Sequence, residues 1–217
     1  VTVNAVNDAP TANAASGATD EDQSVVITLS GDDIDGDNLT FSLDSNATNG
    51  SVSLDGSLAT YTPDANYNGD DSFTFSVSDG EYTATANVSV TVEAVNDAPV
   101  LADVSDVSFD EDGSGSTSLS GSDVDGDDLT YSITGGNDIT ATLSGSDVSF
   151  SAPANYNGSE SFTVAVTDGE YTDSQSITVT VNAVNDAPTA NAASGATDED
   201  QSVVITLSGD DIDGDNL

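Results

Sequence analysis

The sequence contains no lysine, arginine or histidine, and its 40 aspartate and glutamate residues give a formal net charge of -40. Binding a nucleic-acid backbone or docking on an anionic membrane surface needs cationic side chains. The sequence also has no run of about 18 apolar residues that could span a bilayer. We therefore expect no nucleic acid partner and no direct membrane insertion by this segment. Because the acidic groups cannot pair with cations of their own chain, they repel one another or bind external cations.

Cysteine is absent as well, so neither disulfides nor thiolate metal sites can stabilise the fold. Without histidine, cysteine or lysine, the catalytic arrangement that could be proposed is a carboxylate pair in the manner of a glycosidase. A glycosidase-like pair would need a cleft with one raised pKa, and carboxylates spread over repeated turns do not indicate one. We expect no enzymatic activity.

The chain is built from repeats of one length. The sequence AVNDAP occurs at residues 5–10, 94–99 and 183–188, and residues 1–39 recur unchanged as residues 179–217. A fixed interval of this size is typical of one small domain per repeat. We predict the end of a preceding repeat at 1–5, repeat A at 6–94, repeat B at 95–183, and the incomplete start of a further repeat A at 184–217. The chain then represents a window on a longer array, whose partners include further copies of the same repeat.

Apolar and polar residues alternate along most of each repeat, and this period of two predicts half-buried strands. Clear examples are Val25, Ile27 and Leu29, and Phe73, Phe75 and Val77. Clusters of Gly, Asp and Asn between these runs are turn formers. The pattern predicts an all-β fold of tandem Greek-key β-sandwich domains with about seven strands each, arranged end to end. The aromatic residues at alternating positions are expected to form the core: Phe41, Tyr61, Phe73, Phe75, Tyr131, Phe150 and Phe162.

Acidic groups occupy corresponding places in both repeats. Repeat A has an Asn-Asp pair in its linker, then DED, DIDGD and SDGE, and repeat B has NDAP, DED, DVDGD and TDGE. Alternate Asp residues bent by Gly can direct several oxygens toward one point, and hard oxygen donors suit Ca²⁺. The alternative interpretation is a solvated acidic turn.

These motifs resemble the cadherin set of calcium motifs. The stretch YTPDANYNGDDSFTFSVSDGEYTATANVSVTV is more closely similar to the bacterial cadherin-like or Ig-like tandem repeats of giant calcium-binding surface adhesins, including RTX-adhesin-like extender repeats. The resemblance covers both full repeats and implies Ca²⁺ at the junctions between domains. One departure is that Ala94 and Ala183 stand near the position where cadherins place an acidic residue.

Carried over by position, the resemblance implies a junction formed by Glu21, Asn96, Asp97, Asp123, Asp125 and Asp168, and a second formed by Glu111, Asn185, Asp186, Asp211 and Asp213. The full set of candidate calcium ligands adds Asn7, Asp8, Asp33, Asp35, Asp37, Asp79, Asp127 and Glu199.

The function implied by the resemblance is that of calcium-stiffened extender repeats in a long bacterial cell-surface adhesin or extracellular fibre. Such repeats would be secreted or surface-anchored and would mediate adhesion or contact with cells or matrix. One alternative is a self-assembling filament subunit with lateral chain contacts. Another is a carbohydrate- or protein-binding module, which should break the repeat symmetry with a long insertion.

Overall fold

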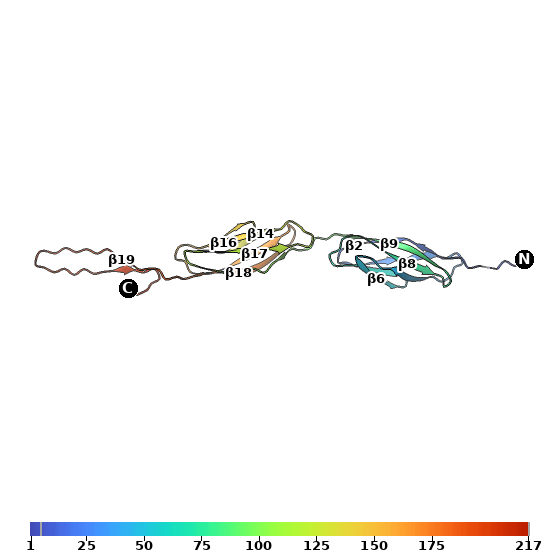
Figure 1. The fold of residues 1–217 in the computed structure, drawn as a ribbon, viewed down its shortest axis with the longest axis horizontal. Helices are drawn as coiled ribbons and strands as arrows, with labels where there is room; N and C mark the ends of the chain where they lie inside the picture. The colour runs from blue at the N-terminus through green and yellow to red at the C-terminus, as the bar shows by residue number, and fades with distance from the viewer. Residues whose placement is uncertain (5, 217) are drawn as a thin grey trace. The chain divides into compact units, whose positions relative to one another are not determined.

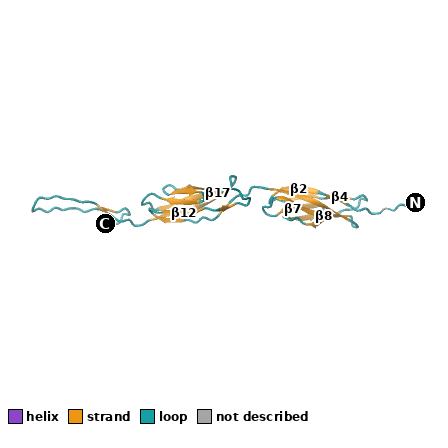
Figure 2. Cartoon of the chain, turned by 45° about the horizontal axis from the view of Figure 1, so that its top comes forward, coloured by secondary structure: helices purple, strands orange, loops and turns teal. Residues whose placement is uncertain are grey.

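The computed structural model describes residues 1–4 and 6–216. Ala5 and Leu217 belong to the first and last predicted segments and lie outside the described residues. The chain divides into two compact units, Val1–Asn96 and Asp97–Leu217, each with its own sheets and core. The described residues form strands, turns and loops (Figures 1 and 2), and they include no helix long and apolar enough to cross a membrane.

The first unit contains two sheets that face each other. A four-stranded sheet has the order β2-β9-β8-β5, a three-stranded sheet has the order β3-β7-β6, and β1 pairs with β4. The strands are β1 (Thr11–Asn13), β2 (Ala15–Asp20), β3 (Val25–Thr28), β4 (Ser30–Asp32), β5 (Thr40–Ser45), β6 (Gly50–Asp55), β7 (Leu58–Pro63), β8 (Gly69–Ser78) and β9 (Thr83–Glu93).

The second unit repeats this arrangement, with sheets β11-β18-β17-β14 and β12-β16-β15 and the pair β10-β13. The strands are β10 (Val100–Leu101), β11 (Val107–Asp110), β12 (Ser114–Ser118), β13 (Gly121–Ser122), β14 (Thr130–Gly135), β15 (Thr140–Ser144), β16 (Asp147–Ser151), β17 (Gly158–Thr167) and β18 (Thr172–Asn182), followed by β19 (Thr189–Ala190) and β20 (Gly209–Asp210).

One pairing in each unit is parallel. Strand β2 runs beside β9 and β11 runs beside β18, whereas the remaining pairs are antiparallel. The last paired residues are Asp20 with Glu93 and Asp110 with Asn182. The acidic turn after β2 or β11 therefore lies beside the end of the last strand, where the linker to the next repeat begins.

The core of each unit is formed by side chains from the inner faces of both sheets. Phe73, Phe75 and Val77 of β8 pack with Tyr61 of β7, and each is at most 1% exposed. In the second unit, Phe150 of the smaller sheet and Phe162 of the larger sheet occupy the corresponding layer. The predicted all-β sandwich is confirmed. Phe41 and Tyr131, also predicted as core, are only partly buried and pack against its edge.

Residues 184–216 show how strongly burial depends on partner strands. Ile27 and Leu29 are 5% and 2% exposed in the core of the first unit, whereas the identical residues Ile205 and Leu207 are 44% and 80% exposed. In this region the described residues form β19 and β20, which pair with each other. The same amino acids therefore form a core strand only where the later strands of the repeat are present to cover them.

Candidate metal centre

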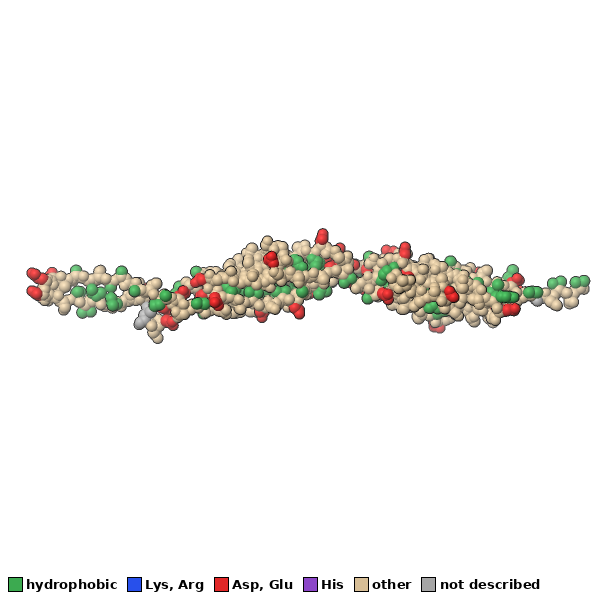
Figure 3. Space-filling model, viewed as in Figure 1, with side chains coloured by type: hydrophobic (Ala, Val, Ile, Leu, Met, Phe, Trp, Pro, Cys, Tyr) green, Lys and Arg blue, Asp and Glu red, His purple; other side chains and the backbone are tan. Residues whose placement is uncertain are grey.

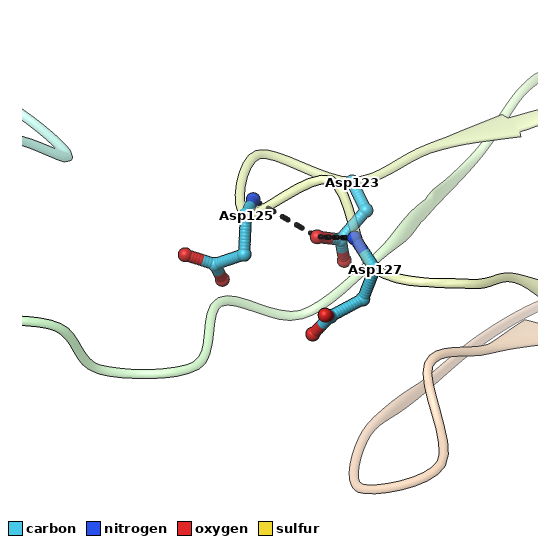
Figure 4. A group of neighbouring side chains, drawn as sticks. All are labelled: Asp123, Asp125 and Asp127. Carbon is cyan, nitrogen blue, oxygen red and sulfur yellow. Dashed lines mark hydrogen bonds between the residues drawn. The ribbon is translucent and has the colours of Figure 1, made fainter.

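The DxDGD loops are organised around their first aspartate. Asp123 Oδ1 accepts hydrogen bonds from the backbone N–H groups of Asp125 (2.9 Å), Gly126 (3.1 Å) and Asp127 (3.3 Å). Gly126 has φ of 80°, a left-handed conformation that glycine adopts without steric cost. Figure 4 shows the Asp123 carboxylate inside the loop, with the Asp125 and Asp127 carboxylates extending from it. One carboxylate oxygen from each of Asp123, Asp125 and Asp127 lies within 4.8 Å of the others.

The same loop is present in both copies of repeat A. Asp33 Oδ1 accepts from the N–H groups of Asp35 (2.9 Å) and Asp37 (3.2 Å). Asp211 Oδ1 accepts from the N–H groups of Asp213 and Asp215, both at 3.1 Å. This Asx-type turn follows from the spacing, because an Asp side chain can bond the backbone two residues further on.

A linker residue is attached to each loop. The backbone N–H of Asp8 donates to Asp35 Oδ2 at 2.7 Å, that of Asp97 donates to Asp125 Oδ2 at 2.7 Å, and that of Asp186 donates to Asp213 Oδ2 at 2.6 Å. The linker Asp therefore bonds the second Asp of the loop three times. Two of these three pairs, Asp97 with Asp125 and Asp186 with Asp213, were grouped at one junction by prediction from the sequence.

The aspartate of the SDGE turn joins this group in repeat A. Asp79 Oδ2 accepts a hydrogen bond from Asn7 Nδ2 at 3.0 Å. Its Oδ1 accepts from the backbone N–H groups of Tyr82 (2.6 Å) and Glu81 (2.7 Å), and these bonds, that from Tyr82 foremost, lower the pKa of Asp79 below its ordinary value. Asp168 in repeat B accepts from Glu170 and Tyr171 in the same way. Asp79 is therefore held in the charged form that a metal ligand requires.

The glutamates of the first two DED turns, Glu21 and Glu111, are buried beside the end of the last strand of their domains. Glu21 is 4% exposed and Glu111 is 7% exposed, which is rare for an ionisable side chain. Glu21 Oε1 accepts from the N–H of Val95 at 2.6 Å, and Glu111 Oε1 accepts from the N–H of Val184 at 2.5 Å. In both cases the donor belongs to the valine of the AVNDAP linker that follows the domain, Val95 or Val184.

Several carboxylate oxygens in these groups are buried without a hydrogen-bond partner among the described residues. They include Glu21 Oε2, Asp33 Oδ2, Asp123 Oδ2 and Asp186 Oδ2. A buried charged oxygen without a partner is costly, and the cost is removed by a hydrogen-bond donor or a cation. Since the chain has no cationic side chain, these atoms fit an external metal ion.

Acids of the second predicted junction lie near enough to Asp186 to affect its carboxyl group. The pKa of Asp186 is raised by burial and by the nearby charges of Asp213, Asp112, Glu111 and Asp211. Four of these five acids were predicted from the sequence as ligands of one junction. Asn185, predicted with them, donates from Nδ2 to the Asp186 carbonyl at 2.9 Å. A hollow of about 400 Å³ borders Asp186, Asp211 and Asn155.

Asp112 was not among the predicted ligands, because the second Asp of DED carries no local signal that separates it from an ordinary turn residue. Its Oδ1 accepts from the backbone N–H of Asn155 at 3.1 Å, and Asp22 accepts from Asn66 in the same way. Residue 112 thereby ties the glutamate turn to a second turn of the same domain while adding charge near Asp186.

The other predicted ligands are divided between the two units of the chain. Glu21 and Asn96 belong to the first unit, while Asp97, Asp123, Asp125, Asp127 and Asp168 belong to the second, so their grouping around one ion stays a prediction. Glu199 lies exposed in a turn of the third copy. Figure 3 shows acidic side chains but no cationic ones on the visible face.

Comparison with solved structures shows the fold. A human protocadherin-24 EC1-2 structure is 19% identical, with 82% of this chain and 100% of that chain covered and a TM-score of 0.52. Human mucin-like protocadherin EC1-2 is 18% identical, with 81% and 98% covered and a TM-score of 0.50. An endo-fucoidan hydrolase of glycoside hydrolase family 107 is 24% identical, with 79% of this chain and 28% of that enzyme covered and a TM-score of 0.34.

No curated protein matches the sequence. The family model described as bacterial Ig domain matches residues 7–91 and again residues 96–180. These two ranges cover most of the chain, and the cadherin repeats of similar fold agree with the resemblance seen in the sequence motifs. The chain therefore belongs to the bacterial Ig domain family, of which it contains these two tandem copies.

Proposed function

We propose that this chain is part of a calcium-stiffened extender in a long bacterial cell-surface adhesin or extracellular fibre. Membership of the bacterial Ig domain family supports a surface or extracellular setting, and the tandem copies support a role as a spacer. The repeat carries its acidic groups at the linker, where an ion would act on the connection between successive domains.

The observation that carries the proposal is the set of buried carboxylate oxygens without a hydrogen-bond partner, at Glu21, Asp33, Asp123 and Asp186. Ca²⁺ takes six to eight oxygen ligands in flexible geometry, which suits a mixture of carboxylates from turns and a linker. Mg²⁺ demands near-ideal octahedral geometry and keeps much of its water, so it suits this arrangement less.

The mechanism proposed is neutralisation of repulsion. Without an ion, the charges of Glu111, Asp112, Asp211 and Asp213 repel that of Asp186, and burial strengthens this repulsion. A bound Ca²⁺ would be shared by the glutamate turn of one repeat and the DxDGD loop of the next. The linker between them would then have one preferred conformation instead of several.

Calcium should raise the melting temperature of the protein. At 10 mM Ca²⁺ and a Kd on the order of 0.1 to 1 mM, as for extracellular modules, each site contributes about 1.4 to 2.7 kcal/mol to the free energy of unfolding. Calorimetry in chelator, in CaCl₂ and in NaCl of equal ionic strength measures this effect. An equal rise in NaCl would mean that the acidic residues form only a solvating coat, and the proposal would be wrong.

An isosteric variant tests the site itself. Asp123→Asn keeps the Oδ1 acceptor of the loop but removes the charge, so we expect calcium affinity in titration calorimetry to fall at least about tenfold at that site. The matched control is Asp147→Asn, because Asp147 lies in an exposed hairpin and accepts a hydrogen bond from Ser118 through the retained Oδ1. Equal losses in the two variants would point to diffuse electrostatic attraction and would contradict a defined site.

A further inference from the structure

We infer that the buried glutamates Glu21 and Glu111, in the first two DED turns, clamp the linker to the preceding domain without any metal. The carboxylate of Glu21 or Glu111 accepts a hydrogen bond from the N–H of the linker valine and so extends the strand pairing by one residue. The linker valine therefore belongs structurally to the domain that precedes the linker. Glu21 and Glu111 are thus positioning residues for the linker. The inference adds a calcium-independent role to the glutamate of the proposed metal site.

The geometry of the parallel ladder carries this inference. In a parallel pair, a residue donates its N–H to one residue of the neighbouring strand and accepts at its C=O from the N–H two positions later on that strand. The Glu21 N–H donates to the Glu93 carbonyl at 2.9 Å. The regular ladder would next join the Glu21 carbonyl to the N–H of Val95.

The chain turns away before that bond can form. Asp22 has φ of 58°, and the N–H of Gln23 donates back to the Asp20 carbonyl at 3.2 Å, which closes a tight turn. The side-chain oxygen Glu21 Oε1 accepts from the N–H of Val95 instead, at 2.6 Å. The Glu21 side chain therefore takes the place of its own backbone carbonyl as the acceptor for the Val95 N–H.

Repeat B has the same arrangement, a side-chain oxygen in place of a backbone carbonyl acceptor, in a different sequence context. The Glu111 N–H donates to the Asn182 carbonyl at 2.9 Å, Asp112 has φ of 60°, and Glu111 Oε1 accepts from the N–H of Val184. The residues before the two linkers differ, Glu93 in one and Asn182 in the other, yet the bonding is the same. The clamp is thus a property of the repeat.

The second linker is bonded on both sides. Val184 is bound by Glu111 of repeat B, and the N–H of Asp186 is bound by Asp213 of the following copy. Asn185 is the residue between these two bonds. Bending of the calcium-free linker should therefore occur mainly through the backbone torsions around Asn185. The hinge would then be much shorter than the six residues of AVNDAP.

Amide hydrogen exchange in chelator tests the clamp on the full chain. Val95 and Val184 are 45% and 46% exposed as whole residues, so these residues are not protected by deep burial. We expect Glu21→Ala to speed exchange at Val95, and Glu111→Ala to speed exchange at Val184, by about tenfold or more. Glu21→Gln and Glu111→Gln keep an oxygen acceptor and should restore the protection to within about threefold.

Amides of the core strands, for example at Val90 and Val179, show whether each variant stays folded. Calcium affinity of the Gln variants separates the two roles, since they should bind Ca²⁺ weakly while keeping the protected linker amide. The inference is overturned if the Ala variants exchange like the parent, if Gln fails to restore protection, or if protection in the parent protein arises only after calcium is added. Failure of calcium binding alone would leave the clamp standing.

Discussion

Phe162→Ala should lower the free energy of unfolding of the second domain by about 3 to 5 kcal/mol, the usual cost of removing a buried phenylalanine. Phe162 is 1% exposed, and its ring meets that of Phe150 edge to face, with centroids 5.3 Å apart and an interplanar angle of 68°. The two rings come from opposite sheets, so the truncation removes a contact that holds the layers together. A small domain has about 5 to 15 kcal/mol in total, so the loss is a large fraction of its stability.

Differential scanning calorimetry or urea unfolding measures the effect. The first unit has its own core, which contains no residue of the second, so its transition should keep the parent midpoint. Tyr171→Ala is the matched control, because this aromatic side chain is 44% exposed in the same domain and its loss should cost less than about 1 kcal/mol. A loss below about 1 kcal/mol for Phe162→Ala would show that the two sheets do not pack through these rings.

Much of this core could be predicted from the sequence, because the information is local. Alternation along β8 placed Phe73, Phe75 and Val77 on one face of a strand, and a strand with one apolar face must bury it. The bonding within DxDGD was equally accessible, since the side chain of the first Asp reaches backbone groups only two to four residues away.

The parts that could not be predicted depend on partners far apart in the chain. Glu21 binds Val95, 74 residues later, and Asp112 binds Asn155, 43 residues later. Sequence motifs identified Glu21 as a metal ligand but contain nothing about the parallel register that sets its carboxylate beside a linker N–H. The identical Ile27 and Ile205 make the same point for burial, because their difference in exposure comes entirely from neighbouring strands.

Asp71 is a further buried acid whose role becomes clear only in the fold. Its Oδ1 accepts from the N–H groups of Ser72 (2.8 Å) and Thr48 (3.1 Å), and its Oδ2 accepts from the N–H of Asn49 (2.8 Å) and the hydroxyl of Tyr61 (3.0 Å). The carboxylate thus supplies the acceptors for the loop between β5 and β6. In repeat B, Glu160 accepts from three successive N–H groups of the equivalent loop, at residues 137–139. Both acids therefore serve the loop of their own domain.

Asp71→Asn should destabilise the first domain by about 2 to 4 kcal/mol at neutral pH. The amide keeps one oxygen but turns its NH₂ group toward two donors, so two hydrogen bonds are lost and buried donors face each other. The matched control is Asp70→Asn, the adjacent and exposed acid, which accepts from Thr91 Oγ1 and should change stability by less than about 0.5 kcal/mol. Equal effects of the two substitutions would mean that net charge, and not the acceptor network, determines the result.

The pH dependence distinguishes these explanations further. Burial alone would raise the pKa of Asp71, but the hydrogen bonds from Asn49, Thr48, Ser72 and Tyr61 lower it below the ordinary value. An aspartate whose pKa is lowered by folding stabilises the protein fully above its unfolded pKa of about 3.9, and this contribution is lost as the pH falls toward the folded value. The deficit of Asp71→Asn should therefore be constant from about pH 7 to pH 5 and shrink at lower pH, when urea unfolding is compared with the parent protein. A deficit that stays unchanged down to about pH 2.5 would show that the carboxylate charge plays no part in holding the loop.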